Sequence, residues 1–140
     1  MESGKVIEQQ KLTNGIKLKL IDQSRSMIGD RWLVELRCEA HIPVDESFWD
    51  TVSDEDRKLQ AEIKKILGDN LVFATVKQRN FIDTHERETV LQDMVQRVYA
   101  SMLEYMKRPH FPQEYFKKQY RETRKKLLLR QAMNRPEEGC

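Results

Sequence analysis

The run DTHERE at positions 83–88 brings carboxylates and an imidazole together, the residue types that bind metals or move protons. A zinc-protease helix needs a second histidine four residues after His85, and Thr89 occupies that position. The run instead predicts a helix start, in which Asp83 or Thr84 caps the first turn and the glutamates complement the positive end of the helix dipole. We therefore expect a structural junction here.

The remaining candidates for catalysis are scattered. His41 falls on the polar side of a predicted strand beside Glu39, which favours a polar ladder, and His110 lies between two prolines. The loop at 24–29 matches neither a nucleophile elbow nor a phosphate-binding loop. The sequence thus predicts no catalytic residue, no cofactor and no metal ligand, although a small enzyme or ligand-binding domain with a pocket stays open as the second alternative.

The chain has two cysteines, too few for a disulfide framework or a four-cysteine zinc site. Cys38 lies within a predicted strand, so we expect it in the core. Cys140 is the last residue, where we expect an exposed thiol without a function.

Charge is distributed unevenly along the chain, although the formal net charge is only +2. Residues 39–62 contain eight acids and two bases, whereas residues 107–135 contain ten bases and two acids. Such asymmetry can steer association, either between the two segments or with different partners.

The strongest functional signal is a set of five bases on the last predicted helix. At 100° per residue they occupy an arc of about 120° opposite the apolar stripe: Lys117, Lys118, Arg121, Arg124 and Lys125. This face is our candidate contact surface for nucleic acid, with Tyr115 or Tyr120 stacking on bases, or for an acidic partner. The structural alternatives are a solvated face, a face neutralised within the molecule or across a dimer by Glu114, Asp93 or the acidic segment, or bases that complement the negative end of the helix's own dipole.

Four strands are expected to support these residues. Residues 5–12 and 16–21 form a hairpin around Asn14-Gly15, a pair that takes the positive φ angles of tight turns. Residues 22–30 form a turn containing Gly29. Residues 32–42 alternate apolar and polar side chains, which predicts a half-buried strand ended by Pro43. Residues 71–76 predict a strand that continues toward Ile82.

Three helices are expected as well. Ser53 and Asp56 form a weak capping box for the first, which Gly68 ends. Its apolar stripe is Leu59, Ile63, Ile66 and Leu67. The second covers residues 86–107 and has a wide apolar face that includes Met94, Met102, Tyr105 and Met106, which we interpret as core. The third starts near Gln113, and its stripe is Phe116, Tyr120, Thr123 and Leu127.

The predicted fold is α+β, in the order β-β-β-α-β-α-α, with an antiparallel sheet of about four strands covered by the C-terminal helices. We expect a single domain over residues 1–135 and a flexible tail at 136–140. Because no apolar run reaches the roughly 20 residues of a membrane span and the first residues lack a secretory signal, the expected location is cytoplasmic, without a membrane partner.

The leading hypothesis is a non-enzymatic protein-interaction or regulatory domain that contacts a protein partner or self-associates as a homo-oligomer, steered by its charge asymmetry. The alternative is phosphate-backbone binding to nucleic acid through the basic helix.

Overall fold

The computed structural model describes residues 4–52 and 56–134. The chain divides into two compact units, one from residues 1–42 and 72–111, the other from residues 43–71 and 112–140. The single domain expected over residues 1–135 stays a prediction, and the tail expected at 136–140 lies outside the described residues. Within the described ranges, no helix has both the length and the apolar character needed to cross a bilayer.

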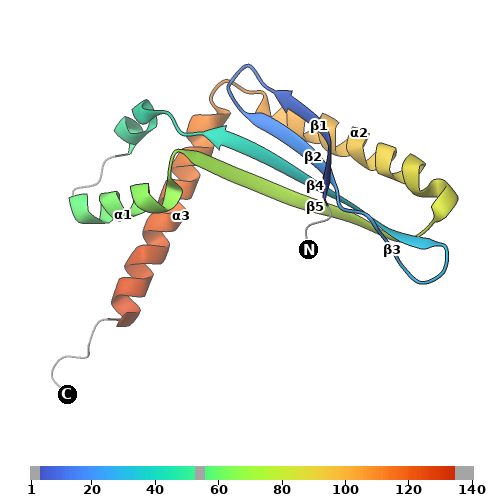
Figure 1. The fold of residues 1–140 in the computed structure, drawn as a ribbon. Helices are drawn as coiled ribbons and strands as arrows, with labels where there is room; N and C mark the ends of the chain where they lie inside the picture. Colours follow the sequence, from blue (N-terminus) through green and yellow to red (C-terminus); the bar gives the residue numbers. More distant parts are fainter. Residues whose placement is uncertain (1–3, 53–55, 135–140) are drawn as a thin grey trace. The chain divides into compact units, whose positions relative to one another are not determined.

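The first unit is built on an antiparallel sheet (Figure 1). Its strands are β1 (Lys5–Lys11), β2 (Lys17–Asp22), β3 (Arg25–Ser26), β4 (Arg31–Pro43) and β5 (Asn70–Asp83). β2 pairs with β1 on one side and β4 on the other, and β3 continues the ladder of β2 along the same edge of β4 in the same register. β5 pairs with the other edge of β4. The α+β class is confirmed, and the two-residue β3 adds a strand where a turn was expected.

The alternation of apolar and polar residues in β4 correctly predicted which side of the strand is buried. Val34, Leu36, Cys38, Ala40 and Ile42 are all 0% exposed. The helix α2 (Arg87–Met106) lies along the sheet (Figure 1). Its inner side buries Leu91, Met94, Val95, Val98, Met102 and Met106, so the three methionines are core residues as expected. Tyr105 was expected on this face as well. That prediction is wrong, since Tyr105 is 59% exposed.

The β1–β2 turn differs from the expected one. Gly15 has φ 94°, but Asn14 does not share a positive φ. The N–H of Gly15 donates to the Leu12 carbonyl, which is the pattern of a three-residue loop with glycine in the left-handed position. The Asn14 side chain instead donates to the carbonyls of Met106 and Arg108, at 2.7 and 2.9 Å. The turn therefore caps the end of α2.

The second unit contains the 3₁₀ helix η1 (Glu46–Thr51), the helix α1 (Arg57–Leu67) and most of α3 (Phe111–Asn134). The rings of Phe48 and Trp49 in η1 contact Phe116 of α3, and Trp49 also contacts Tyr120. These two half-buried aromatics therefore cover an edge of the unit's core. Buried side chains come from both α1 and α3: Leu59, Ile63, Phe116, Tyr120 and Leu127.

The ends of α1 and α3 need corrections. Asp56 is itself the N-cap of α1, since its carboxylate accepts the N–H of Leu59, whereas Ser53 lies outside the described residues. Ile66 was expected in the stripe but is 58% exposed. Gly68 ends α1 with φ 68°, as predicted. α3 begins two residues earlier than expected, because Pro112 fits within a first turn.

Candidate functional site

The run at 83–88 is a structural junction, as predicted. Asp83 Oδ1 accepts the N–H of His85 at 2.9 Å and so caps the 3₁₀ helix η2 (Thr84–Glu86) ahead of α2. The indole N–H of Trp32 donates to Thr84 Oγ1 at 3.2 Å, and the guanidinium of Arg87 lies 4.0 Å from the centre of the same indole. These groups join the end of β5 to α2 and to β4. Among the described residues no group of His, Cys, Asp and Glu side chains is arranged to hold a metal ion.

His41 belongs to a polar ladder on β4. Glu39 accepts from Arg37 Nε at 2.7 Å, and its other oxygen lies 3.0 Å from His41 Nε2. The hydrogen bonds from Arg37 and then His41 hold the pKa of Glu39 below its usual value, against a smaller effect of burial. The expected ladder is confirmed, with Glu39 in contact with both Arg37 and His41.

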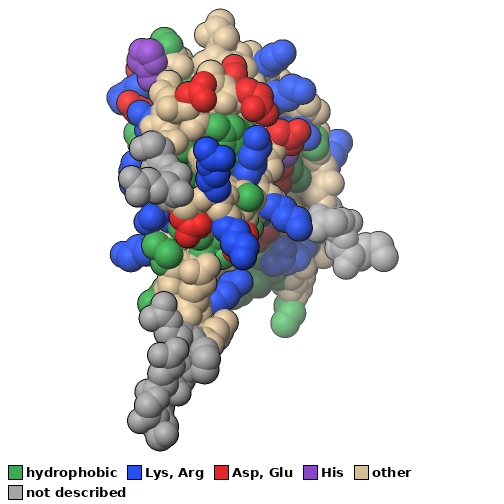
Figure 2. Space-filling model, turned by 90° about the vertical axis from the view of Figure 1, so that its left-hand side faces the viewer, with side chains coloured by type: hydrophobic (Ala, Val, Ile, Leu, Met, Phe, Trp, Pro, Cys, Tyr) green, Lys and Arg blue, Asp and Glu red, His purple; other side chains and the backbone are tan. Residues whose placement is uncertain are grey.

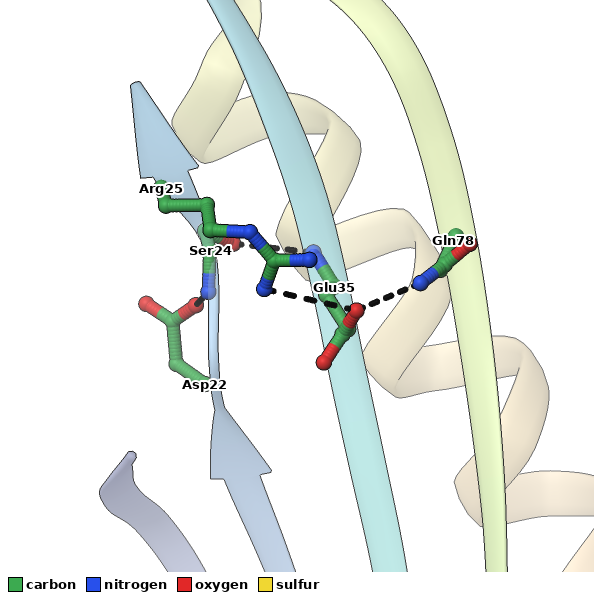
Figure 3. Close-up of polar contacts among 5 residues, drawn as sticks. All are labelled: Asp22, Ser24, Arg25, Glu35 and Gln78. Atoms are coloured by element: carbon green, nitrogen blue, oxygen red, sulfur yellow. Dashed lines mark hydrogen bonds and ion pairs between the residues drawn. The ribbon is translucent and has the colours of Figure 1, made fainter. Parts of the chain in front are cut away.

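Glu35 is a buried charged residue that was not predicted from the sequence. Its side chain lies on the β4 face opposite the core side (Figure 3). Gln78 Nε2 donates to Glu35 Oε1 at 2.5 Å, and Arg25 lies 3.7 Å from the same oxygen. The main-chain N–H of Glu35 donates to Ser24 Oγ, and the Ser24 N–H donates to Asp22 Oδ1. Glu35 thus links β3, β4 and β5 through polar contacts within the first unit.

Cys38 is a core residue, as predicted. It is 0% exposed, and burial raises the pKa of its thiol to about 11, despite an opposing effect of Lys77. The thiolate, which is the nucleophile, is therefore scarce at neutral pH. Cys140 lies outside the described residues.

The basic face of α3, defined as Lys117, Lys118, Arg121, Arg124 and Lys125, lies on a helix whose other side is packed. Phe116 is 0% and Tyr120 4% exposed. Within residues 4–52 and 56–134, no carboxylate oxygen lies within 4.0 Å of a side-chain nitrogen of four of the bases: Lys117, Lys118, Arg121 and Lys125. Arg124 already has an interaction partner. The proposed neutralisation by neighbouring acids is absent for these four within the described ranges.

The acidic segment, residues 39–62, lies largely in the same unit. Several of its acids contact groups of η1 and α1. Asp45 accepts the N–H of Ser47 and caps η1, and Asp56 caps α1. Glu46 lies 3.9 Å from Lys64 of α1. Figure 2 looks onto the side where α1 lies in Figure 1, and Lys and Arg side chains gather in the middle of that face. Over residues 43–71 and 112–140 the sequence has twelve acids and twelve bases, so the basic face is a local concentration of charge and not a surplus of the whole unit.

Two leucines lie beside these bases. Leu128 is 39% and Leu129 60% exposed, whereas Leu127 is buried. Consecutive residues of a helix point about 100° apart, so three leucines in a row cannot all face one core. By this spacing Leu128 falls within the basic arc and Leu129 at its border. The run of three leucines in the sequence is the signal that could have indicated this exposed apolar surface.

The tyrosines do not extend the basic face with stacking surfaces. Tyr120 is buried, edge-on to Trp49, so the expectation that it stacks on bases is wrong. Tyr115 is half-buried, and burial, followed by the charge of Glu122, raises the pKa of its hydroxyl. The face therefore offers positive charge and aliphatic surface.

Comparison with protein-family models, with curated proteins and with solved structures gave no match to this chain. A proposal about function therefore rests on the arrangement of the chain's own side chains.

Proposed function

We propose that this chain is a non-enzymatic binding domain that docks an acidic protein segment on the outer side of α3. The observation that carries the proposal is the lack of a carboxylate near Lys117, Lys118, Arg121 and Lys125 in the described chain, on a helix whose opposite side is packed. Because the helix is held by its core stripe, these bases are positioned before a partner arrives. A partner's carboxylates would supply the missing counter-charges.

The exposed leucines favour a protein over nucleic acid. Leu128 and Leu129 add aliphatic surface to the basic face, and interfaces between proteins combine an apolar centre with a charged surround. Phosphate-backbone binding gains little from such leucines, and single-strand binding draws on stacking aromatics, of which Tyr120 is buried and Tyr115 half-buried. The expected partner is thus a segment that presents acidic and apolar side chains together.

Nucleic acid remains the second candidate, on the strength of the same four bases. Each base can neutralise one phosphate, and the resulting affinity falls steeply as salt rises. The two candidates differ in what they require of the leucines.

Fluorescence anisotropy with labelled probes tests both. The probes are a peptide rich in Glu and Leu and an oligonucleotide, single- or double-stranded, each at two salt concentrations. Replacing Lys117, Lys118, Arg121 and Lys125 by Gln should weaken peptide binding by about tenfold or more, because four exposed ion pairs contribute about 1–4 kcal/mol together. The matched control replaces Lys5, Lys11, Lys17 and Lys19 in the first unit, which removes the same charge and should leave peptide affinity largely intact.

The double variant Leu128→Ser/Leu129→Ser separates the candidates. Loss of peptide binding supports the protein partner. Oligonucleotide binding that is tighter than peptide binding and insensitive to this variant would transfer the proposal to nucleic acid. Equal losses of affinity in the two sets of substituted bases would show that net charge alone drives binding, and would overturn the site.

A further inference from the structure

In the described chain β5 has a strand partner on one side only, β4. β2 and β3 occupy one edge of β4 in a single register, and β5 occupies the other. No strand among residues 4–52 and 56–134 pairs with the far side of β5. An edge strand presents a row of main-chain donors and acceptors that can pair with another strand.

β5 lacks some of the features that normally protect an edge, namely short length, Pro and Gly, although it carries the bases Lys77 and Arg79 at odd positions. It has 14 residues and contains neither Pro nor Gly. Gln78 contacts Glu35, so the residues at even positions lie on the sheet face opposite the core side. From 72 to 80 these positions carry no charge: Val72, Ala74, Val76, Gln78 and Asn80. Val72 is 48% and Val76 42% exposed.

β1, at the other side of the sheet, is protected. It has seven residues, begins and ends with lysine, and its register shifts between Val6 and Glu8. Short length, edge lysines and bulges all oppose pairing with a further strand. The sheet therefore has one blocked edge and one that is ready to extend.

We propose that β5 pairs antiparallel with β5 of a second copy of this chain, about a twofold axis at Ala74. In this register Val72 of each copy lies opposite Val76 of the other. An isologous contact requires such self-complementarity, since each residue meets its partner twice.

Charge complementarity selects this register and this occupant. Lys77 lies opposite Leu71 of the other copy, so no base faces a base. Arg79 lies opposite Asp69, the acid that immediately precedes the strand. Like charges directly opposite each other would destabilise the pair, and opposite charges stabilise it. Phe81 has φ 57°, which interrupts the extended backbone and ends the regular edge.

Analytical ultracentrifugation of the full chain tests the pairing. The wild-type chain should form a dimer as its concentration rises. Val76→Lys should weaken the dimer, because it replaces the Val72–Val76 cross-strand contacts and adds a lysine to the edge. Val6→Lys is the matched control, because Val6 is 44% exposed on the same sheet face at the protected edge, and it should leave the dimer intact. Circular dichroism confirms that both variants are folded.

Thiol crosslinking provides a second readout that adds no charge. In a Cys140→Ser background, Ala74→Cys should crosslink to itself with a short bismaleimide, whereas Gln9→Cys on β1 should not. Cys38 should stay silent because it is buried. A wild-type chain that stays monomeric throughout, a dimer unaffected by Val76→Lys, or equal crosslinking at positions 74 and 9 would each overturn the proposal.

Discussion

The two long helices, α2 with 20 residues and α3 with 24, differ mainly on their outer sides. On α2 the charges find partners close by: Arg97 lies 3.0 Å from Asp93, and Glu104 lies 3.4 Å from Lys107. On α3 four neighbouring bases have no carboxylate within 4.0 Å in the described chain. The difference shows that a basic helix becomes a candidate site only when its charges are left without local partners.

The buried sides of the two helices should contribute similarly to the free energy of unfolding. The substitutions with the largest expected effects test this. Phe116→Ala in α3 should lower the free energy of unfolding by about 3–5 kcal/mol, because the ring is fully buried among Phe48, Trp49 and Tyr120. Leu91→Ala in α2 should cost about 2–5 kcal/mol. Urea unfolding followed by circular dichroism measures both. A loss below about 1 kcal/mol for Phe116→Ala would show that α3 is not docked by its stripe.

An intermediate effect is expected where α2 ends. Asn14→Ala removes two side-chain hydrogen bonds to the carbonyls of Met106 and Arg108. At about 0.5–1.5 kcal/mol for each bond, the variant should lose about 1–3 kcal/mol of stability. Asn14→Asp is the informative companion, because a carboxylate cannot donate to these carbonyls. If Asn14→Asp unfolded at the same urea concentration as wild type, the turn would not be holding the helix end.

The smallest changes in stability are expected for charged residues on the exposed sides of α2 and α3, and they should differ between the two helices. Arg97→Gln breaks an ion pair four residues apart and should cost about 0.3–0.5 kcal/mol. Lys125→Gln breaks none in the described chain, so its stability should match wild type or rise slightly as repulsion from Arg121 falls. Differential scanning calorimetry at low salt resolves the two. A larger loss for Lys125→Gln than for Arg97→Gln would mean that Lys125 has a structural partner.

Patterns of short range were predictable from the sequence. The alternation from Trp32 to Ile42 determined which side of β4 is buried, because successive side chains of a strand point to opposite faces. The positions of Phe116, Tyr120 and Leu127 determined the inner side of α3 in the same way, through helix periodicity. Gly68 marked the end of α1 because glycine accepts a positive φ.

Features that depend on distant residues were not predictable. Asn14 was expected to shape a turn through its own φ, but its side chain is directed to carbonyls more than 90 residues away. Ile66 follows the apolar spacing of α1 and is nonetheless exposed. Glu35 looked like an ordinary outward residue until Arg25 and Gln78 came together around it. Local spacing cannot report which side chains a fold places opposite each other.

The sequence by itself determined the α+β class, the sides on which the main strand and the last helix are buried, and the presence of five bases on one arc of that helix. Only the tertiary structure decided that, within the described chain, four of them lack a carboxylate neighbour and β5 has a strand partner on one side only. The physical reason is the range of the interactions. Periodicity follows from the geometry of one segment, whereas neutralisation and strand pairing depend on which segments meet in space.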